Sequence, residues 1–205
     1  MEERKLNEKE SLELITRMIR NTQQNIEVGS GNQFIVWGVS ILIASILVTI
    51  LTTISGNPFY NFAWFLIPVI GYTWTRVLVK EEKVFTHIDK LLGQTWAIVG
   101  VFCVSIPLII GLLNYFAGAY VMMSGSALYS FIPMIEIIIV SLGLAVSGIA
   151  INSKYIKIAS FIGLGISFLT LLYVPHIIAL SYAAFAITCF IIPGIKLNHE
   201  IKKMK

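Results

Sequence analysis

All 15 lysine and arginine residues of this chain lie in every second break between its long apolar runs. Five lie in the first 32 residues, four between 76 and 90, two at 154 and 157, and four from 196 onwards. Cytoplasmic loops retain Lys and Arg, because their transfer across a bilayer is costly and the membrane potential opposes it. The pattern therefore predicts a multi-pass protein of the inner (plasma) membrane, with both termini in the cytoplasm.

Six apolar segments are long enough to cross a bilayer, which takes about 20 residues in a helix. The expected spans are 33–54, 59–79, 95–113, 128–150, 155–172 and 177–195. The breaks at 55–58 and 174–176 are short and contain proline, as expected for tight turns between antiparallel neighbours. We therefore expect an all-α fold of six transmembrane helices arranged as three hairpins, preceded by an amphipathic cytoplasmic helix.

The chain divides into three parts on this reading. Residues 1–32 form a cytoplasmic helix with a Gly/Ser linker, 33–195 form the transmembrane domain, and 196–205 form a basic cytoplasmic tail. The stretch 114–127 is uncharged and still apolar. It fits a loop in the headgroup region, a re-entrant segment or an extension of either neighbouring helix.

The composition argues against a soluble domain and against a nucleic-acid-binding protein. Charged residues make up 13% of the chain, about half of what an ordinary soluble domain carries. The net charge of +4, placed on the cytoplasmic rim, indicates contact with anionic lipid headgroups rather than with nucleic acid. Cys103 and Cys189 lie inside apolar runs, where small core residues are the usual interpretation.

Residues 7–28 show the pattern of an amphipathic helix. Asn7 and Glu10 have the spacing of a capping box. An apolar stripe follows at spacings of three and four residues; it contains Leu12, Ile15, Ile19 and Ile26. The helix can lie along the membrane surface or on the cytoplasmic loops, dock a cytoplasmic protein partner, or pair with a second copy as a short coiled coil.

Three stretches carry a resemblance to a known family. They are Glu8–Gly38, Val84–Asp89 and the Pro-Gly pair at 193–194. The chain resembles a family of small bacterial membrane proteins with six predicted helices and no established activity. The resemblance implies the six-helix fold, and it favours a regulatory role, because we associate some members with neighbouring winged-helix regulators.

Glu136 is the only acidic residue enclosed by an apolar run. Placing an acid inside a membrane costs about 2.5–3.5 kcal/mol even on lenient insertion scales, and no basic residue lies at that depth. Counting residues along the other helices places Ser105, Ser167 and Tyr182 at the same level. These four residues form a candidate ligand or proton site, and the alternative is a structural hydrogen bond between helices.

The sequence contains no catalytic motif, and His87, His176 and His199 do not have metal-ligand spacing. We therefore expect a protein that is not an enzyme and has no cofactor. The leading expectation is a regulatory or accessory membrane protein that docks a partner through its N-terminal helix. The alternative is a carrier or channel for a small solute, ion or proton that uses Glu136.

Overall fold

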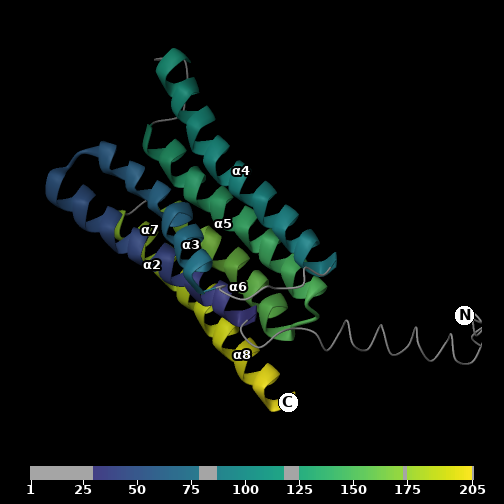
Figure 1. Cartoon of the computed structure of the whole chain (residues 1–205). Coiled ribbons are helices and arrows are strands. Elements are labelled where there is room, and N and C mark those ends of the chain that lie inside the picture. Colours follow the sequence, from purple (N-terminus) through teal and green to yellow (C-terminus); the bar gives the residue numbers. More distant parts are fainter. Residues whose placement is uncertain (1–29, 79–86, 118–124, 173–174, 205) are drawn as a thin grey trace, which may run out of the picture.

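The computed structural model describes residues 30–78, 87–117, 125–172 and 175–204, and all regular structure within them is helical (Figure 1). The elements are α2 (Ser30–Ser55), the 3-10 helix η1 (Pro58–Phe65), α3 (Leu66–Leu78), α4 (His87–Ala117), α5 (Gly125–Ala150), α6 (Lys154–Leu169), the 3-10 helix η3 (Thr170–Leu172), α7 (Pro175–Phe185), the π-helix η4 (Ala186–Ile191) and α8 (Ile192–Met204). The amphipathic helix expected over 7–28 lies outside the described residues.

Four helices are long and apolar enough to cross a membrane. They cover Gly31–Ser55, Ile88–Leu112, Phe131–Ala150 and Ile178–Glu200. The expectation of an all-α membrane protein is thus confirmed at this coarser level. The other two expected spans, 59–79 and 155–172, are each divided between a 3-10 helix and an α-helix.

Several helices extend beyond the expected spans. The first residues of the 114–127 stretch continue α4 as far as Ala117, and its last residues begin α5 at Gly125. Residues 118–124 between them are not described. The last helix continues to Met204, so the basic segment after 195 begins as an extension of α8.

Hydrogen bonds between helices show which helix ends lie together. The Gly31 N–H donates to Asn198 Oδ1 over 3.0 Å, and Asn198 Nδ2 donates to Asn32 Oδ1 over 2.7 Å. The start of α2 therefore lies beside α8 near its C-terminal end (Figure 1). Trp96 Nε1 donates to Ser147 Oγ over 3.1 Å, which places the first half of α4 against the second half of α5.

The described lysines gather at this same end of the bundle. The Lys196 ammonium of α8 lies 4.9 Å from the ring centre of Tyr155, at the start of α6. The start of α4 lies beside the end of α5, which leads directly into α6. The lysines concerned are Lys90, Lys154, Lys157, Lys196, Lys202 and Lys203.

The core lies between α2, α5, α6 and the continuous helix formed by α7, η4 and α8. Its fully buried side chains include Ile137, Leu144, Ile156 and Phe185. Among the described elements, the backbone of α4 packs only against α5, and α3 packs against α2 and η1 (Figure 1). Both outer helices expose large apolar side chains, as helices facing lipid do.

Glycines allow α2 to approach the last helix closely. A Cβ atom on Gly194 would lie 2.7 Å from the carbonyl oxygen of Gly31, and one on Gly38 would lie 2.8 Å from Phe190 Cβ. Small residues serve this purpose in membrane bundles, where close van der Waals packing drives association. This contact fixes the position of the α7–η4–α8 helix in the core.

The π-helix adjusts the inward face of the last helix. Along the continuous helix formed by α7, η4 and α8, buried positions recur every four residues, at Ser181, Phe185, Cys189, Pro193 and Leu197. In a uniform α-helix such a stripe rotates by about 40° per repeat, because a turn holds 3.6 residues. A π turn holds more residues, and here the Ile192 N–H donates to the carbonyl of Ile187, five residues back. The segment therefore keeps both halves of this helix facing the core.

Candidate functional site

The site is centred on Glu136 of α5 and Tyr182 of α7. The Tyr182 hydroxyl donates a hydrogen bond to Glu136 Oε2 over 2.6 Å, a short distance even for an O–H···O bond. Tyr182 is 9% exposed, whereas Glu136 is only partly buried. The pair therefore combines a buried phenol with a carboxyl side chain that is partly buried between the helices.

Two further elements complete the surroundings of this pair. Trp64 of η1 packs its ring against the Tyr182 ring, with the centroids 4.6 Å apart and the planes tilted by 42°. Cys103 of α4 lies within electrostatic range of both Glu136 and Tyr182. Trp64, Glu136 and Tyr182 thus bring η1, α5 and α7 together at one place, with Cys103 of α4 near enough for an electrostatic interaction.

The other two expected site residues use their hydroxyl groups within their own helices. Ser105 is half-buried in α4 and donates to the carbonyl of Val101 over 2.7 Å. Ser167 is fully buried in α6 and donates to the carbonyl of Leu164 over 2.7 Å. The structure therefore brings Tyr182 to Glu136, and it shows no hydrogen bond from either serine to that carboxyl.

Sequence reasoning did not include Trp64 in the site. It compared depths only for groups that could form a hydrogen bond with Glu136. A search that included aromatic rings would have selected Trp64, since the expected second span puts it near the depth of Glu136. The packing against Tyr182 depends on η1, whose 3-10 conformation the sequence pattern did not predict.

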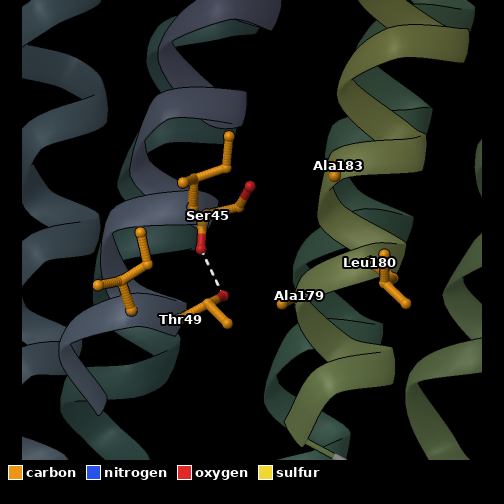
Figure 2. A pocket seen from close by; sticks show the side chains of 7 residues that line it. Ser45, Thr49, Ala179, Leu180 and Ala183 are labelled. Carbon is orange, nitrogen blue, oxygen red and sulfur yellow. Dashed lines mark hydrogen bonds between the residues drawn. The ribbon is translucent and has the colours of Figure 1, made fainter. Parts of the chain in front are cut away.

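A shallow groove lies on the outside of the bundle between α2 and α7, with a volume of about 360 Å³ (Figure 2). It is lined by Ser45, Ile46, Thr49, Ile50, Ala179, Leu180 and Ala183. The Thr49 hydroxyl donates to the carbonyl of Ser45 over 2.6 Å, so it offers no free donor to a ligand. The groove is open and apolar, which suits lipid acyl chains, and it does not include the Glu136–Tyr182 pair.

A second groove, of about 380 Å³, lies between α4 and α5. It is lined by Thr95, Ile98, Val99, Phe102, Ile139, Leu142, Gly143 and Val146. The Thr95 hydroxyl donates to the carbonyl of Leu91 within α4, so the remaining surface is again apolar. Both grooves belong to the lipid-facing exterior and supply no polar recognition.

Comparisons with models of protein families, with curated proteins and with solved structures found no match to this chain. Within the part of the chain that the structure describes, no three His, Cys, Asp or Glu side chains group closely enough to hold a metal ion. The groups that define the chemistry of the site are the Glu136 carboxyl, the Tyr182 phenol and the neighbouring Trp64 and Cys103 side chains.

Proposed function

We propose that this chain crosses the inner membrane six times, with both termini cytoplasmic, and that it carries a proton or a small cationic solute through Glu136. The gathering of the described lysines at one end of the bundle supports the orientation, because cytoplasmic ends retain basic residues. The start of α2 also lies beside α8 near its C-terminal end, which supports an even number of crossings.

The lengths of the divided helices support six spans rather than four. A 3-10 helix rises about 2.0 Å per residue and an α-helix about 1.5 Å. The 8 residues of η1 and 13 of α3 therefore have a combined length of roughly 35 Å. The 16 residues of α6 and 3 of η3 reach roughly 30 Å. Both match a hydrocarbon core of about 30 Å.

Labelling of single cysteines with an impermeant reagent in intact cells tests the orientation. In a variant lacking Cys103 and Cys189, a cysteine at Ser124 should be labelled, whereas cysteines at Lys83 and Lys202 should be labelled only after lysis. The opposite pattern would contradict the proposed orientation.

The Glu136–Tyr182 hydrogen bond is the main observation behind the proposed transport function. It holds a carboxyl group among apolar helices, and among the described residues no lysine, arginine or histidine forms an ion pair with it. An acid inside a membrane is expensive and usually marks a substrate or proton pathway. A proton or a small cation can neutralise this carboxyl group. The Tyr182 phenol holds the carboxyl group in place while the proton or cation binds and leaves.

Flux in proteoliposomes tests this function with Glu136→Gln as the main variant. Gln keeps the shape and the hydrogen bond but cannot release a proton or carry a charge. We expect the variant to fold normally and to lose at least about ten-fold of the proton or monovalent-cation flux, whereas Glu200→Gln, at the basic end, should retain it. Full flux in Glu136→Gln, or wild-type flux no greater than that of empty liposomes, would show that the pair is only structural.

A second function rests on the sequence pattern of residues 7–28. We propose that its apolar stripe docks a cytoplasmic protein, which would make the chain a regulatory or accessory subunit rather than an enzyme. In the sequence this segment is followed almost at once by α2, which begins at Ser30 at the basic end of the bundle. A partner bound there would lie on the cytoplasmic side of the proposed topology.

Deletion of residues 1–28 tests the docking function. Insertion and thermal stability should stay close to wild type, while co-purification of a specific cytoplasmic protein should be lost. Ile15→Ser combined with Ile19→Ser should have the same effect, and Glu13→Gln on the polar face should not. A truncated chain that fails to insert or fold would show that the segment is structural.

A further inference from the structure

Two ammonium groups from different helices share one aromatic ring at the basic end of the bundle. Lys154 Nζ lies 5.3 Å and Lys196 Nζ 4.9 Å from the ring centre of Tyr155. Lys154 and Tyr155 open α6, whereas Lys196 belongs to α8. A cation over a ring is favourable, but the arrangement also holds two like charges close to one point.

In the part of the chain that the structure describes, no acidic side chain forms a salt bridge with these lysines; Glu200 lies one turn beyond Lys196 on α8 without pairing with it. A third lysine, Lys157, donates to Asn152 Oδ1 over 3.0 Å in the turn before α6, and that amide is neutral. Neither Lys154 nor Lys196 forms a salt bridge there. Three cations on two adjacent helices therefore remain without an anion.

The N-terminus of α6 adds to the positive potential at this point. Its N-cap residue, Ser153, makes no side-chain hydrogen bond to the helix. The Ser153 hydroxyl is buried, with the residue 5% exposed, and it has no partner within the described residues. Free N–H groups and the helix dipole make such an end favourable for a phosphate.

Exposed apolar side chains directly adjoin the lysines. Ile158, next to Lys157, is 56% exposed, and Ile195, next to Lys196, is 54% exposed. Both isoleucines lie in the proposed spans 155–172 and 177–195. The acyl chains of a phospholipid whose headgroup contacts the lysines would therefore pack against them, whereas a soluble phosphate would make no such contact. The combination of clustered cations and exposed apolar surface therefore favours a lipid over a soluble phosphate.

We propose that Lys154, Lys157 and Lys196, together with the N-terminus of α6, bind the phosphate of an anionic phospholipid headgroup. The Tyr155 ring positions two of the ammonium groups, and the phosphate supplies the missing negative charge. Basic pockets between helices on the cytoplasmic side of a membrane are suited to such headgroups. The site is independent of Glu136 and would bind lipid whether or not the chain carries a solute.

Lipid titration of the purified full chain in detergent tests the site, with phosphatidylglycerol as the probe, phosphatidylcholine as its neutral counterpart and native mass spectrometry as the readout. Wild type should retain phosphatidylglycerol preferentially. Lys154→Gln combined with Lys196→Gln should weaken this binding by at least about ten-fold. Lys202→Gln combined with Lys203→Gln removes the same charge from the end of α8 and should weaken it far less.

Two further variants separate the roles of charge and ring. Lys154→Arg with Lys196→Arg keeps both charges and should retain the lipid, and Tyr155→Leu should give an intermediate loss because it no longer positions the ammonium groups. Equal losses in the two Gln pairs would overturn the proposal, since charge anywhere at this end would then suffice. Displacement of the lipid by millimolar inorganic phosphate, but not by chloride of equal ionic strength, would identify a soluble ligand and also overturn it.

Discussion

Replacing Tyr182 by Phe removes one hydroxyl and keeps the ring that packs against Trp64. The 2.6 Å bond to Glu136 is then lost, and the carboxyl group is left without this donor. Hydrogen bonds between membrane helices contribute about 0.6 kcal/mol on average and up to about 1.7 kcal/mol. An abandoned buried acceptor costs about 1–3 kcal/mol. We therefore expect Tyr182→Phe to lower the free energy of unfolding by about 1–2 kcal/mol.

A double-mutant cycle with Glu136→Leu isolates the bond from the other effects of each change. Reversible unfolding in mixed detergent micelles measures the free energy of unfolding for wild type, both single variants and the double variant. We expect a coupling energy of about 0.6–1.7 kcal/mol between the two positions. Coupling below about 0.3 kcal/mol is what independent sites give, and that result would refute a stabilising bond between these side chains.

Tyr60→Phe serves as the matched control for this cycle. Tyr60 lies at the start of η1 and is 38% exposed, so the loss of its hydroxyl should change stability by no more than about 0.5 kcal/mol. A comparable loss at Tyr60 and Tyr182 would mean that any tyrosine hydroxyl stabilises the protein in the chosen detergent. The effect at Tyr182 would then carry no information about Glu136.

Two predictions concern the contact between α2 and α8. Gly194→Ala should destabilise the bundle by about 1–3 kcal/mol, because its Cβ would lie 2.7 Å from the Gly31 carbonyl oxygen. Gly165→Ala should be neutral, because nothing lies within 4 Å of a Cβ at that position. Unfolding in micelles measures both variants, and equal effects would contradict the close approach of the two helices. Asn198→Ala removes the bonds to Gly31 and Asn32 and should cost about 1 kcal/mol, with faster hydrogen exchange at the start of α2. Unchanged exchange there would show that this link does not hold the helix ends together.

The sequence predicted helix positions well, because apolar runs bounded by Gly, Pro and charged residues leave few alternatives in a membrane. Spans 33–54 and 128–150 each lie within one helix of nearly the same bounds, Ser30–Ser55 and Gly125–Ala150. The described lysines also gather at one end of the bundle, as the spacing of the basic residues implied. Depth along the membrane normal is a one-dimensional property, so a linear pattern suffices to predict it.

The sequence did not predict changes of helix type. Hydropathy is the same for a residue in a 3-10, an α or a π turn, so η1, η3 and η4 left no signal in the apolar pattern. Pro193 gives the clearest cause for one of them, because it lacks the N–H that would bond to the carbonyl of Cys189. The π segment ends at Ile191, two residues before Pro193, and the position of the inward face depends on that segment.

The choice of partner for Glu136 depended on side-chain length rather than on depth. Serine and threonine hydroxyls reach the carbonyl three or four residues back in their own helix, and both Ser105 and Ser167 bond in this way. A phenol hydroxyl is too far from its own backbone to do so and needs a partner on another helix when it is buried. Tyr182 bonds to Glu136, and Trp96, another long donor, likewise bonds across to a neighbouring helix. In an apolar bundle the long polar side chains therefore identify the contacts between helices, and short hydroxyls at the right depth do not.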